Sequence, residues 1–206
     1  MDIRKELKKT PPREPLTSLE SLVLDFLWRE STLRRDTIPS LCREAPSLED
    51  AIWLATDSIG RTGKMYSHQV KVRKSSRDAL AEIMIRKMRP RRLSSFHELF
   101  LFTRANAPWG IGELTIYDVA LRVGAYLNLE PKRLYLHTGV REGITSLANA
   151  ARENISVKAP WIISPDIPWR FEDYMTWDDT EDFLCTYRRV FETITDHTLY
   201  GKDYGN

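Results

Sequence analysis

The chain has little cysteine and no long apolar run. Cys42 and Cys185 are its only cysteines, too few for a disulfide framework or a cysteine zinc site. The apolar runs are far shorter than the roughly 20 residues of a membrane-spanning helix, and the charged first nine residues contain no apolar signal region. We therefore expect a cytoplasmic protein with no membrane partner.

Histidine is also scarce, and its spacing gives no sign of a metal site. The four histidines are scattered and form no His-x₃-His pair, so we expect no metal and no cofactor. Acidic groups at 172–173 and 178–182 offer carboxylates for a metal ion. Acidic residues are, however, also typical of the first turn of a helix, where the helix dipole favours them.

No internal repeat and no convincing sheet are evident, and the apolar residues recur mostly at helical spacing. With 42% apolar and 29% charged residues, the composition is that of a globular protein. We predict a mainly α fold, with a single all-α domain over residues 16–198. Two intertwined helical lobes are the alternative. The proline-containing basic residues 1–15 are expected to form a flexible leader, and residues 199–206 a loose tail.

Apolar periodicity and capping residues predict most helices. The expected segments are about 19–29, a short helix after Thr37, and then 51–55, 78–88, 95–102, 114–127, 145–154 and 177–194. Gly139 and Gly143 are expected to bracket a loop before the helix at 145–154. The alternation over 69–73 allows a short strand, and the proline-rich segment 160–169 is expected to wrap the surface of the core.

The stretch around which the chain is organised is a two-glycine turn at residues 109–112 between two predicted helices. Gly110 and Gly112 can adopt backbone angles that are closed to other residues. A glycine turn that opens a helix also points free N–H groups outward, which favours an anion or phosphate. The following helix has one apolar stripe, made up of Ile116, Val119, Ala120, Val123 and Leu127.

The net charge of +2 hides an uneven distribution. Between Arg61 and Arg92 there are eleven Lys or Arg residues against two acidic ones, whereas residues 164–206 contain four against ten. This asymmetry predicts one surface that faces a polyanion and a separate acidic surface. The alternative is that the two regions neutralise each other within one fold.

Aromatic and basic residues interleave within the basic region, as is typical of tracks that bind nucleic acid. The candidate binding residues there are Lys64, Tyr66, His68, Lys71 and Arg73. Lys132 and Arg133 are expected to add phosphate contacts beside the glycine turn. The alternatives are an exposed loop between two helices for the first group and a solvated basic pair for the second.

Gly110-Ile111-Gly112, followed by Ile116 and Val119, resembles the helix-hairpin-helix motif of DNA-binding proteins. The resemblance implies that backbone N–H groups of the hairpin hold a phosphate, which gives sequence-independent DNA binding. The residues it assigns to this contact are Gly110, Ile111, Gly112 and Thr115.

Over residues 96–141 the chain resembles the helix-hairpin-helix DNA glycosylase superfamily, which has an all-α fold of about this length. The family's catalytic aspartate has no counterpart, because residues 131–141 contain no Asp or Glu and the aligned position is His137. The lysine of members that cleave the DNA backbone is replaced by Glu113-Leu114. His137 is the single catalytic candidate, as a general acid or base. The alternative is a loop or capping histidine.

Two functions therefore follow from the sequence. The first is binding of DNA or another nucleic acid by a glycosylase-like protein whose base-excision chemistry is lost or altered. The second is a non-enzymatic helical scaffold that binds a protein partner through its acidic C-terminal helix.

Overall fold

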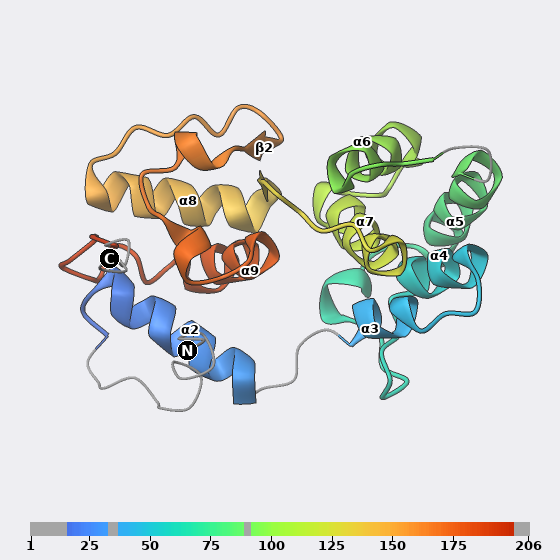
Figure 1. The fold of residues 1–206 in the computed structure, drawn as a ribbon, viewed down its shortest axis with the longest axis horizontal. Coiled ribbons are helices and arrows are strands. Elements are labelled where there is room, and N and C mark those ends of the chain that lie inside the picture. Colours follow the sequence, from blue (N-terminus) through green and yellow to red (C-terminus); the bar gives the residue numbers. More distant parts are fainter. Residues whose placement is uncertain (1–15, 33–36, 89–91, 200–206) are drawn as a thin grey trace, which may run out of the picture. The chain divides into compact units, whose positions relative to one another are not determined.

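The computed structural model describes residues 16–32, 37–88 and 92–199. Helices dominate, which confirms the prediction of a mainly α protein. The chain forms two compact units: unit 1 spans Met1–Arg35 and Arg133–Asn206, and unit 2 spans Asp36–Lys132. Figure 1 shows the helices of each unit. The predicted leader at 1–15, and all but the first residue of the predicted tail at 199–206, lie outside the described residues.

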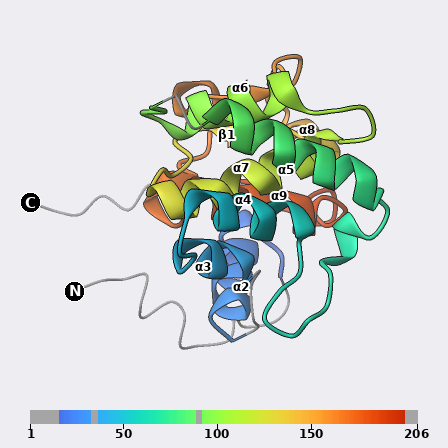
Figure 2. The same cartoon turned by 90° about the vertical axis from the view of Figure 1, so that its right-hand side faces the viewer.

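Unit 2 is built around one central helix. Its helices are α3 (Ile38–Arg43), α4 (Leu48–Asp57), α5 (Lys74–Met88), α6 (Phe96–Asn106) and α7 (Glu113–Leu127), with a 3₁₀ turn η1 (Ser67–Gln69) before α5. Helix α7 packs against α3, α4 and α6, as Figure 2 shows. It is therefore buried beyond the single stripe that the sequence predicts, and Thr115, Tyr117 and Arg122 are buried with that stripe.

Local capping explains where several helices of unit 2 begin and end. The hydroxyl of Ser47 accepts the N–H of Asp50 at the start of α4, and that of Ser95 accepts the N–H of Glu98 at the start of α6. Ser58 ends α4 and Asn128 ends α7, each in the left-handed conformation. The sequence identifies these helices because each cap acts within three or four residues.

Unit 1 joins the two ends of the chain in one apolar core. Its helices are α2 (Leu19–Thr32), α8 (Thr138–Ala151) and α9 (Trp177–Tyr187), with 3₁₀ turns η2 (Ser164–Asp166) and η3 (Phe171–Asp173). Two short strands, β1 (Leu134–Tyr135) and β2 (Trp161–Ile162), pair antiparallel. The centre of the core is an aromatic cluster formed by Phe26, Phe171, Phe183, Tyr187 and Phe191.

Polar contacts also tie α2 to the C-terminal part of unit 1. The N–H of Leu19 donates to the carbonyl of Asp196 at 2.7 Å, and the Tyr187 hydroxyl donates to the carboxylate of Asp25. Burial raises the pKa of Tyr187, and its hydrogen bond to Asp25 adds to the shift. Residues about 160 positions apart therefore share one core.

Several predicted boundaries are wrong. Helix α8 begins at Thr138, so Gly139 and Gly143 lie inside it and do not bracket a loop. Helix α5 begins at Lys74, and residues 69–73 form the end of η1 and a turn where the alternation allowed a strand. Helix α9 ends at Tyr187, well before Ile194.

The segment 160–169 is more deeply buried than the sequence suggests. It supplies β2 and places Ile162, Ile167 and Trp169 in the core of unit 1. Apolar side chains set between prolines pack inward here because β2 pairs with β1. Within the described ranges, no helix has both the length and the apolar character needed to cross a bilayer.

Candidate nucleic-acid interface

The glycine turn between α6 and α7 has a single position with positive φ. The N–H of Ile111 donates to the carbonyl of Pro108 at 3.2 Å, and Gly110 has a φ of +90°. A turn closed in this way, with positive φ only at its third residue, is a type II turn, which explains the glycine. Trp109 occupies the second position, and its side chain is 86% exposed.

Gly112 plays a different part from Gly110. Its backbone is extended, with a φ of −86°, and an added Cβ would meet open space. It is the N-cap of α7 and provides no side chain to cap the first N–H groups. Of the two glycines expected to need unusual backbone angles, only Gly110 does.

Thr115 does not face a ligand. Its side chain is buried, and its hydroxyl donates to the Gln69 Oε1 atom at 3.1 Å. The amide nitrogen of Gln69 in turn donates to the carboxylate of Asp118 at 2.7 Å. The Thr115 hydroxyl is therefore engaged by Gln69 of η1, and a phosphate contact at Thr115 stays a prediction for its backbone N–H alone.

Arg122 is the centre of the same buried network and is only 1% exposed. Its guanidinium donates to the carbonyl of Ala55 at 3.1 Å and to the hydroxyl of Ser58 at 2.7 Å. It lies 3.6 Å from the carboxylate of Asp118. The spacing of Asp118 and Arg122 favours an exposed helix pair, but the central position of α7 buries Arg122 and leaves Asp118 half-buried.

Tyr66 also belongs to this network. The guanidinium carbon of Arg122 lies 5.7 Å from the centre of the Tyr66 ring, in a cation–π arrangement. The ring is half-buried. Tyr66 is therefore a packing residue in this structure, and its face towards Arg122 is closed to a nucleic-acid base.

The loop before α5, which we call the basic loop (residues 59–73), exposes several cations. The N–H of Gly60 donates to the carbonyl of Lys64, which closes a small hairpin. Lys64, Lys71 and Arg73 are exposed and have no ion-pair partner among the described residues, and His68 is exposed beside them.

Several other cations of the basic region form ion pairs or hydrogen bonds within unit 2. Arg61 binds the carboxylate of Glu44, and Lys74 binds that of Asp78. Arg77 is buried and donates to the carbonyl of Asp57. The local excess counted from the sequence therefore overstates the positive charge available to a partner.

The glycine turn and the basic loop meet at the first turn of α5. The hydroxyl of Ser76 donates to the carbonyl of Trp109 at 3.2 Å, and an added Cβ on Gly110 would lie 3.2 Å from the same hydroxyl. Arg73 directly precedes α5, within one helical turn of Ser76. We call the exposed residues Lys71, Arg73, Trp109 and Gly112 the turn surface.

Lys132 lies beyond the opposite end of α7 from the glycine turn. Gly112 starts α7, and Lys132 follows the other end of this 15-residue helix, which is about 22 Å long. Arg133 belongs to unit 1, where its guanidinium lies 5.9 Å from the centre of the Trp161 ring. The helix therefore separates Lys132 from the turn, and the phosphate contact expected of Arg133 stays a prediction.

His137 lies in unit 1 as the N-cap residue of α8, and its side chain is 4% exposed. Its Nε2 atom pairs with the carboxylate of Glu181 from α9, which is also buried. A carboxylate absent from residues 131–141 thus reaches the histidine from a distant helix. The burial of both groups favours a structural pair over an acid or base that meets a substrate.

Cys185 lies near this pair. An added Cβ on Gly139 would be 2.5 Å from the Cys185 sulfur and 3.4 Å from the Cε1 atom of His137. Burial and, second, the charge of Glu181 raise the pKa of the Cys185 thiol to about 11. The thiolate that nucleophilic catalysis requires is therefore disfavoured.

We expect Cys185 to react slowly with iodoacetamide. At pH 8 its thiolate fraction is about one-hundredth of that of an ordinary cysteine, so alkylation should accelerate with pH to about pH 11. The measurement is the alkylation rate of the peptide containing Cys185, followed by mass spectrometry against pH, with N-acetylcysteine as the reference thiol. A plateau at or below pH 9 would contradict the raised pKa.

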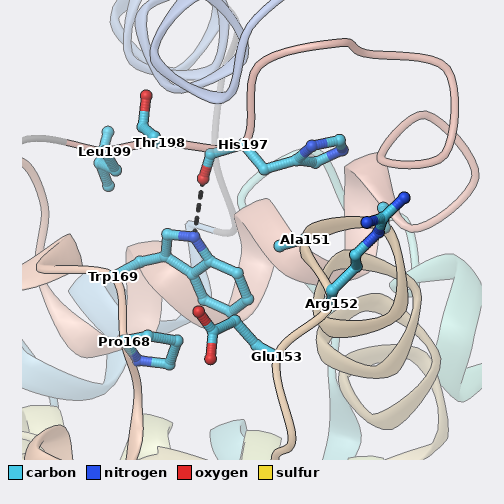
Figure 3. Close-up of a pocket in the computed structure, with 9 residues that line it drawn as sticks. Ala151, Arg152, Glu153, Pro168, Trp169, His197, Thr198 and Leu199 are labelled. Carbon is cyan, nitrogen blue, oxygen red and sulfur yellow. Dashed lines mark hydrogen bonds between the residues drawn. The ribbon is translucent and has the colours of Figure 1, made fainter.

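A pocket of about 470 Å³ lies at the C-terminal end of α8 in unit 1. Figure 3 shows Trp169 within it, with its indole N–H donating to the carbonyl of His197 at 2.8 Å. Arg152 and Glu153 line the pocket from the exposed end of the helix. The indole N–H is already satisfied, so it does not need a ligand as its partner.

The acidic start of α9 is used within unit 1. The Thr176 hydroxyl accepts the N–H of Asp179 and the Asp179 carboxylate accepts the N–H of Thr176, which together cap the helix. The Thr176 hydroxyl also donates to Asp178, and Glu181 pairs with His137. Across residues 16–32, 37–88 and 92–199, no three His, Cys, Asp or Glu residues gather as a metal site would require.

Comparisons of the chain with protein-family models, curated proteins and solved structures found no match.

The residues that organise the turn surface but that sequence reasoning missed are Ser76, Gln69, Asp118 and Arg122. A signal exists for the last two, because they are the only charged residues between Leu114 and Leu129. Two charges inside an otherwise apolar helix indicate a buried pair. Ser76 and Gln69 carry no such signal, since both residue types are common in exposed loops and caps.

Proposed function

We propose that unit 2 binds nucleic acid through the turn surface. The observation that carries this proposal is the hydrogen bond from Ser76 to the glycine turn, which sets the turn against the start of α5, directly after Lys71 and Arg73. Both cations are exposed and have no ion-pair partner in the part of the chain that the structure describes. The uncapped start of α7 adds N–H groups of favourable polarity for a phosphate. The helix-hairpin-helix resemblance points to the same turn, so two lines of reasoning support one surface.

The proposed function is binding and does not include base excision. His137, the single catalytic candidate, is buried in unit 1 and engaged by Glu181. Glu113, the first residue of α7, would lie close to a phosphate at the start of this helix. Its like charge reduces the affinity by about 1 kcal/mol at a wet surface. The surface is therefore suited to moderate, salt-sensitive binding, which does not depend on base sequence.

We expect the triple variant Lys64→Ala/Lys71→Ala/Arg73→Ala to bind DNA more weakly and with less dependence on salt. The variant removes Lys71 and Arg73 of the turn surface and Lys64 of the adjoining hairpin. If all three contact phosphates, the slope of log K against log salt should fall by about 2 for single strands and about 2.7 for duplex. The measurement is fluorescence anisotropy of labelled single- and double-stranded DNA across a salt series.

The matched control is Arg43→Ala/Arg86→Ala/Arg104→Ala, which removes three exposed cations from helices of the same unit. This control should leave most of the slope unchanged. An equal loss in both triple variants would show that only the overall charge matters. If the wild-type chain does not bind DNA even at low salt, the proposal fails.

A further inference from the structure

Trp109 has an exposure that packing within unit 2 does not explain. Its indole is 86% exposed, whereas the neighbouring turn residues Pro108 and Ile111 are half-buried. The type II turn fixes its backbone through the Pro108–Ile111 hydrogen bond, and Ser76 binds its carbonyl oxygen. A large apolar ring is thus exposed to solvent, while two hydrogen bonds hold the backbone that carries it.

The surroundings of the indole indicate the kind of partner that would cover it. Its carbonyl oxygen is bonded to Ser76 in the first turn of α5, and Arg73 and Lys71 lie just before that helix. A partner that covers the ring therefore also comes near Lys71 and Arg73, which have no ion-pair partner within residues 16–32, 37–88 and 92–199. A nucleic-acid strand meets both requirements, because its bases stack on aromatic rings and its phosphates bind cations.

Resting on the proposed nucleic-acid binding, we propose that Trp109 stacks on an unpaired base, so that the turn surface takes single-stranded nucleic acid as its preferred ligand. In a duplex the base faces are covered by their neighbours, and a projecting indole has no free face to stack on. In a single strand each base has an accessible face, while the phosphates remain available to Lys71 and Arg73. The stacking is independent of base identity, since every base has a π face.

The test compares the wild-type chain with Trp109→Ala and Trp109→Phe on three labelled ligands. These are a 12-nucleotide oligothymidylate, an abasic deoxyribose-phosphate oligomer of the same length, and a 12-base-pair duplex. We expect Trp109→Ala to weaken oligothymidylate binding by roughly 5- to 100-fold and to leave binding of the abasic oligomer unchanged. Trp109→Phe should restore most of the lost affinity, because it keeps an aromatic face.

The wild-type chain should also bind oligothymidylate more tightly than the duplex at the same salt concentration. Equal weakening of the abasic and base-containing ligands by Trp109→Ala, or no weakening of either, would overturn the stacking role. If Trp109→Ala has no effect while the Lys64/Lys71/Arg73 variant still lowers the salt slope, nucleic-acid binding stands and the stacking proposal fails. If no oligomer binds, both fail, and the exposed indole is better suited to a protein partner.

Discussion

Gly143→Ala is expected to destabilise unit 1 by about 3 kcal/mol or more. Gly143 lies inside α8 at its crossing with α9, where an added Cβ would overlap the carbonyl oxygen of Leu184. The same Cβ would lie 2.7 Å from the Leu184 carbonyl carbon. Since the obstacle is backbone, a rotamer change cannot relieve the overlap and the two helices must move apart.

Whether Gly143→Ala lowers or raises the stability of unit 1 distinguishes the effect of packing from that of helix propensity. Alanine is favoured over glycine inside a helix by about 1 kcal/mol, so propensity alone predicts a more stable variant. The matched control is Thr145→Ala, an exposed position two residues further along the same helix, which should be neutral or slightly stabilising. We would measure thermal unfolding of the full chain together with peptide-resolved hydrogen exchange. A stabilised Gly143→Ala chain would contradict the close crossing of α8 and α9.

Arg122→Ala is expected to destabilise unit 2 by about 3 kcal/mol, because it removes a buried guanidinium and leaves the half-buried Asp118 with Gln69 but without its cation. The change leaves Asp118 without its cation and removes the hydrogen bonds to Ser58 and the Ala55 carbonyl. It also removes the cation that faces the ring of Tyr66. The guanidinium of Arg122 contacts α4 and the basic loop from its place on α7, so all three segments lose contacts in this variant.

Peptide-resolved hydrogen exchange of the full chain tests this second expectation. Protection should fall in peptides from α4, residues 59–73 and α7, while peptides from unit 1 keep theirs. Arg104→Ala, which removes an exposed arginine from α6, is the control for loss of an arginine alone and should change little. Unchanged protection in Arg122→Ala would show that the buried network contributes little to the stability of unit 2.

The same variant links stability to the proposed function. Arg122 is buried and cannot touch a ligand, but it holds Ser58 and Tyr66, which flank the small hairpin of the basic loop. The neighbouring Asp118 binds Gln69 at the other end of this loop. The placement of Lys64 and Lys71 therefore depends on side chains that lie behind the turn surface.

Most helices could be predicted from the sequence because their determinants are local. Ser47, Ser95 and Thr176 each cap a helix by accepting the N–H three residues later. Ser and Thr are preferred at this position, so the caps can be recognised from the residue types. The apolar stripe of α7 is visible for the same reason. The glycine turn is equally local, since only Gly110 meets the positive φ that its turn requires.

The candidate site depended much more on distant contacts. Ser76 and Trp109 are 33 residues apart, and Gln69 and Asp118 are 49 apart. Periodicity and capping act over three or four residues and contain no information about such pairs. For this reason the sequence does not show that the Thr115 hydroxyl bonds to Gln69, that one face of Tyr66 lies towards Arg122, or that Trp109 is exposed.

By itself, the sequence determined the helical character of the protein, most of its helices and the position of the glycine turn, because these follow from interactions between near neighbours. Only the tertiary structure decided that Gly139 and Gly143 lie in a helix crossing, and that His137 pairs with Glu181. It also decided which cations remain free for a partner. Burial and charge pairing depend on the segment that packs opposite, and that segment lies far away in the chain.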